Sequence, residues 1–431
     1  MRVFLFSFWF LPDNRTAVNR VKYFKKKFIE ANIDLHLIYC EDSLPQSHQN
    51  NLFYKIPYVH FFYKFSRFLL KKQWLTLYKI IHFFYIISKK RDVYDFYRNY
   101  KAVESQMATI YHKNDVVITS APPYSALNIG YYLKRKYGVN WIIDYRDPWT
   151  LGYSTLGHSN FADKLRKLIQ RKEELKFLES ADHIITVSDS LRRMFPERFQ
   201  HKIHIIPNGA NTDEMDFSKI NSTPKSFSIV YAGTMHSQQL ENIYFFDVVR
   251  KFISNEKIHP ENFKIHFIGA ADSAELKSEI NKYQLEEYVN CTSRVQLNVL
   301  YGYMYNASLF LHLKYSERDK IITSKQYDYL ALQKPILLPE SDNGDLEESI
   351  LNNNAGYVCN NKDQLYQTLH QEYYKFINNK DIRIHRDDHF LHQISRNYAS
   401  DKLMELLYGE TMLSSKLATE IDLKFTNKQW N

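Results

Sequence analysis

The chain alternates short apolar runs with segments of helical periodicity, and this alternation limits the folds that it can adopt. It begins with VFLFSFWF, continues through a basic helical pattern at 18–32, and then gives IDLHLIYC. The same order returns with DVVITSA, a helical pattern at 126–137, WIIDYRD, a charged helical pattern at 160–180, and HIITVS. Strands separated by helices predict a doubly wound parallel sheet, because a connection between parallel strands has room for a helix.

A second series of the same plan follows the segment KIHIIPNGANTDEM. It consists of SFSIVYAGT, FKIHFIGA, VNCTS, SLFLHLKY and KPILLPE, with helical patterns at 240–254, 274–283 and 324–332. The length of 431 residues also exceeds what one hydrophobic core usually organises. We therefore expect an α/β protein with two Rossmann-like, doubly wound domains.

The expected domain bounds follow from these two series. The N-terminal domain covers 1–212, a polar linker lies at 213–225, and the C-terminal domain covers 225–390. A further helical pattern predicts a crossover helix and tail at 391–431. Open α/β sheets bind ligands beyond the carboxyl ends of their strands, so we expect the domains to face a central cleft lined by residues that follow strands.

The positive charge of the chain is concentrated in residues 54–101. This segment has 11 Lys and Arg against two acids, and 11 − 2 = +9 equals the net charge of the whole chain. It also has 16 aromatic residues, and its apolar residues recur at helical spacing. This arrangement favours the surface of an anionic membrane. Buried aromatic helices with a solvated basic edge are the first alternative, and stacking on single-stranded nucleic acid is a more distant one.

Other features of the sequence argue against several classes of protein. Cys40, Cys291 and Cys359 form no CxxC pair, which argues against a zinc ribbon or a disulfide framework and favours a reducing cytoplasm. The run MRVFLFSFWF lacks a small-residue cleavage site and is interpreted as a first strand. No stretch has the roughly 18 to 20 uninterrupted apolar residues of a transmembrane helix. HRDDHFLH at 385–392 is more typical of a solvated helix start than of a metal site.

Charged residues end one strand expected in the first domain. In WIIDYRDPWT, the residues Asp144, Arg146, Asp147 and Trp149 follow the apolar run. We expect them to line the cleft, and an ion pair that only joins the strand end to a loop is the alternative.

A turn and a helix follow the preceding strand. In TSAPPYSALNIGYYLKRKYG, Pro122 and its neighbour Pro123 predict an extended turn, and Ser125 is the expected N-cap. The N-terminus of such a helix can face a polar or anionic ligand. A capped helix without any ligand is the alternative.

Two motifs of the second domain combine into a candidate phosphate and ribose site. VYAGT ends a strand with Gly233 and Thr234, where a glycine lets backbone amides approach a diphosphate. In SKQYDYLALQKPILLPE, the carboxylate of Asp328 can accept hydrogen bonds from ribose hydroxyls, and Lys325 offers positive charge to phosphates. An ordinary surface pair between Lys325 and Asp328 is the alternative. Neither a Walker A sequence nor GxGxxG is present.

Six segments in order resemble the GT-B glycosyltransferases of the GT4-like group. They are TSAPPYSALNIGYYLK, WIIDYRDPWT, ADHIITVSDSLRRMF, IIPNGAN, VYAGT and SKQYDYLALQKPIL. The resemblance implies a nucleotide-sugar donor held mainly by the C-terminal domain and an acceptor bound mainly by the N-terminal one. It also implies transfer with retention at the anomeric carbon, without a metal or another cofactor.

The resemblance assigns roles to particular residues. Gly233 and Thr234 face the donor phosphates, Asp328 takes the position of the ribose-binding carboxylate, and Ser324 and Lys325 line the phosphate side. Asn208 and Gly209 match the segment that enters the inter-domain crossover.

The chain departs from its relatives at several positions. Lys320 stands where many relatives have the first Glu of a pair, and Thr234 and Gln239 stand where many have Arg and Lys. Arg146 replaces a His that numerous relatives place at the end of the N-domain strand.

The function expected from these features is retaining transfer of a sugar from a nucleotide-sugar donor to a saccharide or polyprenyl-linked saccharide acceptor in bacterial-type surface polysaccharide synthesis. Arg146 and Asp147 are the expected catalytic residues, with Asp147 orienting an acceptor hydroxyl. We expect a cytoplasmic enzyme, peripheral at the inner face of the cell membrane, with no nucleic-acid partner. A non-catalytic GT-B scaffold and a GT-B nucleotide-sugar epimerase or hydrolase are the alternatives.

Overall fold

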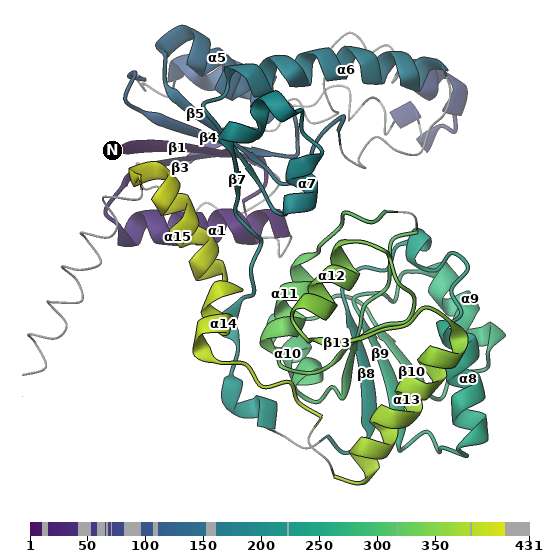
Figure 1. Ribbon diagram of the computed structural model, residues 1–431. Coiled ribbons are helices and arrows are strands. Elements are labelled where there is room, and N and C mark those ends of the chain that lie inside the picture. Colours follow the sequence, from purple (N-terminus) through teal and green to yellow (C-terminus); the bar gives the residue numbers. More distant parts are fainter. Residues whose placement is uncertain are drawn as a thin grey trace, which may run out of the picture. The chain divides into compact units, whose positions relative to one another are not determined.

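A computed structural model shows that the chain forms two compact units, which are described separately (Figure 1). The first unit contains residues 1–207 and the chain from 399 onward, and the second contains residues 208–398. The structure describes residues 1–10, 16–41, 53–57, 65, 68–69, 71–81, 96–106, 111–151, 161–221, 224–316, 318–379 and 382–409. Half of segment 54–101, and with it part of its expected helices, lies outside these ranges.

The first unit is built on a parallel sheet with seven strands among the described residues. Their order is β3-β2-β1-β4-β5-β6-β7. They are β1 (Arg2–Ser7), β2 (Asp34–Glu41), β3 (Phe53–Pro57), β4 (Val116–Ala121), β5 (Asn140–Tyr145), β6 (His183–Thr186) and β7 (Ile203–Ile205). The strand order reverses between β1 and β4, so a ligand is expected near the carboxyl ends of these strands.

Helices cover both faces of this sheet. They are α1 (Thr16–Glu30), α4 (Phe96–Val103), η1 (Glu104–Gln106), α5 (Ala126–Tyr137), α6 (Phe161–Ser180), α7 (Asp189–Arg193), η3 (Glu197–Lys202) and α15 (Arg396–Tyr408). Figure 1 shows α5 and α6 over one face and α1 and α15 over the other. The first face buries Phe6, Tyr100 and Trp141, and the second buries Val21 and Leu403. Part of the high aromatic content is therefore core.

The second unit repeats this plan with six parallel strands in the order β10-β9-β8-β11-β12-β13. They are β8 (Phe227–Ala232), β9 (Phe263–Ile268), β10 (Val289–Thr292), β11 (Leu309–Leu311), β12 (Ile336–Leu338) and β13 (Gly356–Val358). Its helices are η4 (Thr212–Glu214), η5 (Phe217–Asn221), η6 (Ser237–Gln239), α8 (Phe245–Asn255), α9 (Ala274–Lys282), α10 (Leu297–Tyr305), α11 (Ser324–Ala331), α12 (Asp345–Asn352), α13 (Lys362–Ile377) and α14 (Asp388–Gln393). The strand order reverses between β8 and β11, which places the expected ligand edge beyond Ala232 and Leu311.

The boundary between the units differs from the expected bounds. It falls between Pro207 and Asn208, and the expected linker belongs to the second unit, where its Met215 and the preceding Ala210 are buried in the core. The chain returns at Ala399, and α15 continues into the core of the first unit. The expected N-terminal domain, 1–212, therefore ends a few residues too late, because Ile206 belongs to one core and Ala210 to the other.

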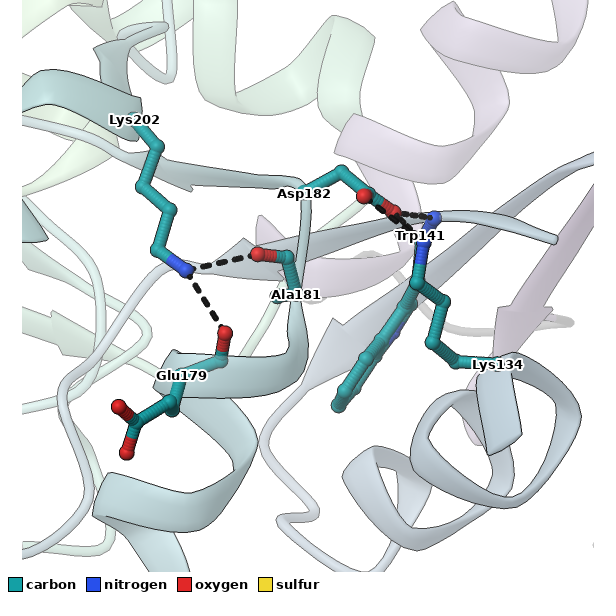
Figure 2. Close-up of polar contacts among 6 residues, drawn as sticks. All are labelled: Lys134, Trp141, Glu179, Ala181, Asp182 and Lys202. Carbon is teal, nitrogen blue, oxygen red and sulfur yellow. Dashed lines mark hydrogen bonds and ion pairs between the residues drawn. The ribbon is translucent and has the colours of Figure 1, made fainter. Parts of the chain in front are cut away.

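A polar brace fixes the amino ends of β5 and β6, at the edge opposite the expected ligand side (Figure 2). Asp182 accepts two hydrogen bonds from the Lys134 ammonium, at 2.8 and 2.7 Å, and one from the amide of Trp141 at 2.7 Å. Lys202 donates to the carbonyls of Glu179 and Ala181, at 3.2 and 2.8 Å, and so satisfies carbonyls at the end of α6. The brace ties α5, β5, β6 and the end of α6 to one another.

We expect Asp182→Ala to lower the free energy of unfolding by about 2 kcal/mol, because it leaves the amide of buried Trp141 without its acceptor. Urea unfolding of the purified variant measures this change. Glu179→Ala is the control, since its exposed carboxylate is lost while its carbonyl still accepts from Lys202. Equal losses in the two variants would contradict the prediction.

Candidate functional site

The charged residues expected to line the cleft at the carboxyl end of β5 differ in their exposure. Asp144 lies inside β5 and is 1% exposed. Its two oxygens accept from Arg20 Nε of α1 and from the Ser120 hydroxyl of β4, each at 3.0 Å. The side chain therefore holds α1, β4 and β5 together and does not extend beyond the strand end, where the sequence analysis placed it.

Arg146 and Asp147 follow β5 in the loop. Arg146 is 9% exposed, and its Nη2 donates to the carbonyl of Pro122 at 3.1 Å, which joins the loops that follow β4 and β5. Asp147 is exposed, while its carbonyl accepts from the Tyr124 hydroxyl at 3.1 Å. The Asp147 carboxylate is thus presented to solvent from a loop that backbone contacts hold in place.

Aromatic stacking also joins these two loops. The rings of Tyr124 and Trp149 stack with their centroids 5.1 Å apart and an interplanar angle of 12°. Ser125 is the N-cap residue of α5, but its side chain makes no capping hydrogen bond there. It accepts instead from the amide of Phe96 at 3.1 Å and so connects α4 to the start of α5. Ser125 anchors the neighbouring helix in the interior, and it does not take the capping role expected from the sequence.

In the second unit, Gly233 and Thr234 lie directly beyond β8 and are both exposed. Gly233 has φ of 122°, which disfavours any residue with a side chain, and an added Cβ would have no atom within 4 Å. The open space is on the side where a ligand could approach the backbone. The carbonyl of Thr234 accepts from the Tyr231 hydroxyl at 3.0 Å, which fixes the turn.

Arg294 is a basic residue at this turn that the sequence analysis missed. It follows β10 and is exposed, and its Nη2 lies 3.3 Å from the Thr234 hydroxyl. By contrast, Gln239 is 3% exposed and is bound to the Tyr231 hydroxyl and the Leu313 carbonyl, at 3.0 and 3.2 Å. Where many relatives have basic residues, this chain therefore has a structural Gln239 and a Thr234 with an arginine beside it. No sequence signal links Arg294 to Thr234, because they follow different strands.

Lys325 lies at the start of α11, next to Ser324, and its ammonium is 3.7 Å from the centroid of the Tyr231 ring. Burial lowers the pKa of Lys325 to about 7. Burial and the positive charges of Lys325 and Arg318 lower the pKa of His236. Positive potential therefore gathers at this edge of the second sheet, beside Gly233 and Thr234.

Asp328 is on the same helix as Lys325 but contacts a different segment. Its Oδ1 accepts from the amide of Asn211 at 3.1 Å. Burial raises the pKa of the Asp328 carboxyl, while nearby Arg396 and the Asn211 amide act in the opposite direction. Lys325 and Asp328, both in the described part of the chain, do not pair with each other, so the surface-pair alternative does not describe them.

Asn208 and Gly209 lie at the start of the second unit, where the chain enters it. Gly209 has φ of 69°, and an added Cβ would lie 2.6 Å from the carbonyl oxygen of Ser395. The next residue, Ala210, pairs with Ser395 in a parallel bridge. Asn208 and Gly209 thus form a crossover of two chain passages that only a glycine permits. In the described part of the chain, no group of three or more His, Cys, Asp or Glu is placed to hold a metal ion.

Comparisons with known proteins bear on the family and on the fold. The family model described as Glycosyltransferase Family 4 matches residues 17–214. A search of curated proteins found no match. Among solved structures, sucrose-phosphate synthase from Thermosynechococcus elongatus is similar with a TM-score of 0.56 and 11% identity, over 98% of this chain and 99% of that chain.

Two further structures share the fold. A Staphylococcus aureus TarM mutant in complex with Fondaparinux, alpha-GlcNAc-glycerol and UDP gives a TM-score of 0.53 and 10% identity, over 95% of this chain and 100% of that chain. A putative UDP-N-acetylglucosamine 2-epimerase from Listeria monocytogenes gives a TM-score of 0.50 and 6% identity, over 95% and 96% of the two chains. At such identities the likeness concerns the fold alone.

The two parallel sheets and these neighbours define a GT-B protein. The family match lies almost entirely in the first unit, and its residues 17–214 are similar to Glycosyltransferase Family 4.

We expect the affinity for a nucleotide-sugar to fall by about tenfold per pH unit above pH 7 if Lys325 binds the diphosphate. In the protein without ligand, Lys325 has its pKa lowered to about 7 and loses its proton as the pH rises. A bound diphosphate favours the charged form of Lys325. Calorimetric titrations from about pH 6 to 9 measure this slope, and Lys325→Arg, which stays charged, should flatten it. The same slope in both proteins would refute the prediction.

Proposed function

We propose that the protein transfers a sugar, with retention of configuration and without a metal, from a nucleotide-sugar to a saccharide or polyprenyl-linked saccharide in bacterial-type surface polysaccharide synthesis. The binding of the nucleotide-sugar donor is supported by a group of residues that lies beyond the carboxyl end of β8. There, the open backbone at Gly233 lies next to Thr234, with Arg294 beside it and Lys325 on the adjoining Tyr231 ring.

The chemistry that these residues support begins with the departing diphosphate. Breaking its bond to the sugar concentrates negative charge on the phosphate oxygens, which Lys325 and Arg294 are suited to stabilise. Asp328 holds the Asn211 amide with one oxygen and offers the other to the ribose hydroxyls. The donor is thereby fixed at its nucleotide end while its sugar end reacts.

The first unit supplies the acceptor side in this proposal. Asp147 is exposed and orients the acceptor hydroxyl, and Arg146 stabilises charge at the reacting end. In front-side attack the acceptor oxygen bonds to the anomeric carbon as the bond to the diphosphate breaks. The departing phosphate oxygen takes the acceptor proton, so no second carboxylate is needed and the configuration is retained.

The test is a thermal-shift screen against nucleotides and their sugar conjugates, starting with UDP, which the TarM complex contains. A ligand at 100 times its dissociation constant should add about 2.7 kcal/mol of stability. Asp328→Ala should weaken binding by about 1 to 3 kcal/mol, through loss of charged hydrogen bonds to ribose. Asp363→Ala, an exposed acid at the start of α13, is the control.

The outcomes separate the proposed transferase from its alternatives. Sugar transfer to an acceptor, with the anomeric configuration retained by NMR, supports the proposal. A folded protein that binds no nucleotide at millimolar concentration would be a scaffold, and consumption of the donor without any acceptor would indicate an epimerase or hydrolase.

The membrane part of the proposal is supported by the described residues between 68 and 81. Five of the thirteen exposed large apolar residues of the described chain lie here: Phe68 at 49%, Trp74 and Leu75 at 55%, Leu77 at 41% and Ile80 at 49% exposed. Lys71, Lys72 and Lys79 are exposed among them. Within the described residues, no helix has the length and hydropathy needed to span a bilayer. Apolar side chains flanked by lysines suit adsorption to an anionic surface.

We expect the double variant Lys71→Ala with Lys72→Ala to bind anionic vesicles about thirtyfold more weakly, at about 1 kcal/mol per lost charge. Cosedimentation with phosphatidylglycerol vesicles measures the change, with phosphatidylcholine vesicles as the neutral comparison. Leu75→Ser should also weaken binding, whereas Leu351→Ser, equally exposed but on α12, should not. Unchanged binding in both segment variants would show that this surface does not contact lipid.

A further inference from the structure

One buried carboxylate holds the loop that carries Arg146 and Asp147. Glu174 of α6 is 0% exposed, and both of its oxygens accept from the residues that end and follow β5. Oε1 accepts from the Tyr145 hydroxyl and from the amide of Trp149, the latter at 3.0 Å. Oε2 accepts from the hydroxyl and the amide of Thr150, the amide at 3.1 Å. Four donors from three residues therefore converge on one side chain.

The same loop is held on its other side by the turn that follows β4. Trp149 stacks on Tyr124, whose hydroxyl donates to the carbonyl of Asp147, and Arg146 donates to the carbonyl of Pro122. The amide of Trp149 also has the Tyr145 hydroxyl at 3.0 Å, whereas the amide and the hydroxyl of buried Thr150 both donate to Glu174. The path of the loop from 145 to 150 therefore depends on the Glu174 carboxylate most directly at Thr150.

Packing of α6 does not require an acid at this position. Glu174 lies on the buried stripe of the helix with Gln170, Phe177 and Leu178, where an apolar side chain would fill the same space. Burial raises the pKa of Glu174, and the hydrogen bonds from Thr150 and Tyr145 act against this shift. A buried carboxylate is costly unless its hydrogen bonds are satisfied, and here the donors belong to the last residue of β5 and to the loop that follows it.

We propose that Glu174 is a positioning residue for sugar transfer, which sets the place of Arg146 and Asp147 without contacting either substrate. This inference rests on the proposed transferase function and on the acceptor role of this loop. Arg146 and Asp147 lie between Tyr145 and Trp149, which both donate to Glu174, so release of Trp149 and Thr150 frees the segment that carries them. Nucleotide binding, in contrast, uses the residues beyond β8 in the second unit.

The test compares Glu174→Gln with Glu179→Gln, an exposed glutamate on the same helix. Glutamine keeps the size of the side chain. However, its NH2 group replaces one of the two carboxylate oxygens and cannot accept the hydrogen bonds that this oxygen accepts from the loop. We expect the amides of Trp149 and Thr150 to exchange hydrogen faster, and kcat/KM for the acceptor to fall about a hundredfold, as small misplacements of reacting groups do. The nucleotide dissociation constant should stay unchanged, and Glu179→Gln should match the wild type throughout.

A second pair of variants covers the case in which Glu174→Gln does not fold. Thr150→Val removes one hydroxyl donor at nearly constant volume, and Thr150→Ser restores it. The valine variant should lose acceptor turnover and loop protection together, and the serine variant should regain both. Wild-type exchange rates in Glu174→Gln, or parallel losses of nucleotide affinity and transfer, would overturn the inference. A wild-type protein that transfers no sugar would refute the proposed function itself, before any variant is compared.

Discussion

The second unit depends on a close approach between two passages of the chain. Gly209 lies so near the carbonyl of Ser395 that any Cβ would clash, and on either side of that carbonyl Ala210 accepts from Arg396 and donates to Ile394. The passage that enters the unit and the one that leaves it are therefore hydrogen-bonded as a short ladder. Because Asn211 donates to Asp328 directly after this ladder, the connection and the candidate ribose-binding carboxylate are placed by the same backbone.

Acidic residues in the first unit divide between interior and surface according to what they bind. Asp144 and Glu174 are buried, and their oxygens accept from the side chains and amides of neighbouring elements. Asp147 is exposed, and only its backbone is engaged in the loop. Buried carboxylates with satisfied hydrogen bonds fix geometry, whereas the carboxylate of Asp147 faces solvent.

The sequence predicted both sheets because parallel strands buried on two faces give continuous apolar runs, such as VVITSA and FSIVYA. It missed β3, which lies in the basic aromatic segment, and the short β13. It also missed α10, α12 and the long α13, although the side chain of Asn361 caps the start of α13.

Site residues were less predictable than the fold. Asp144 was expected beyond the end of the strand, but it lies within β5. The sequence pattern does not locate a strand end to one residue. Glu174 was hidden beside Glu173 in a helix that is charged throughout, where only packing decides which acid faces inward. Arg294 and Thr234 follow β10 and β8, which β9 separates in the sheet, and no local pattern of the sequence records this arrangement.

The brace at the amino edge of the first sheet has a consequence for the length of α6. Asp182 and Lys202 fix the end of this helix, and Glu174 lies eight positions before Asp182. Each residue added or removed between these points would turn Glu174 by about 100° around the helix axis and shift it by about 1.5 Å. Insertions and deletions should therefore not be tolerated in the last two turns of α6, because these turns set the distance between its end, which Lys202 holds, and Glu174.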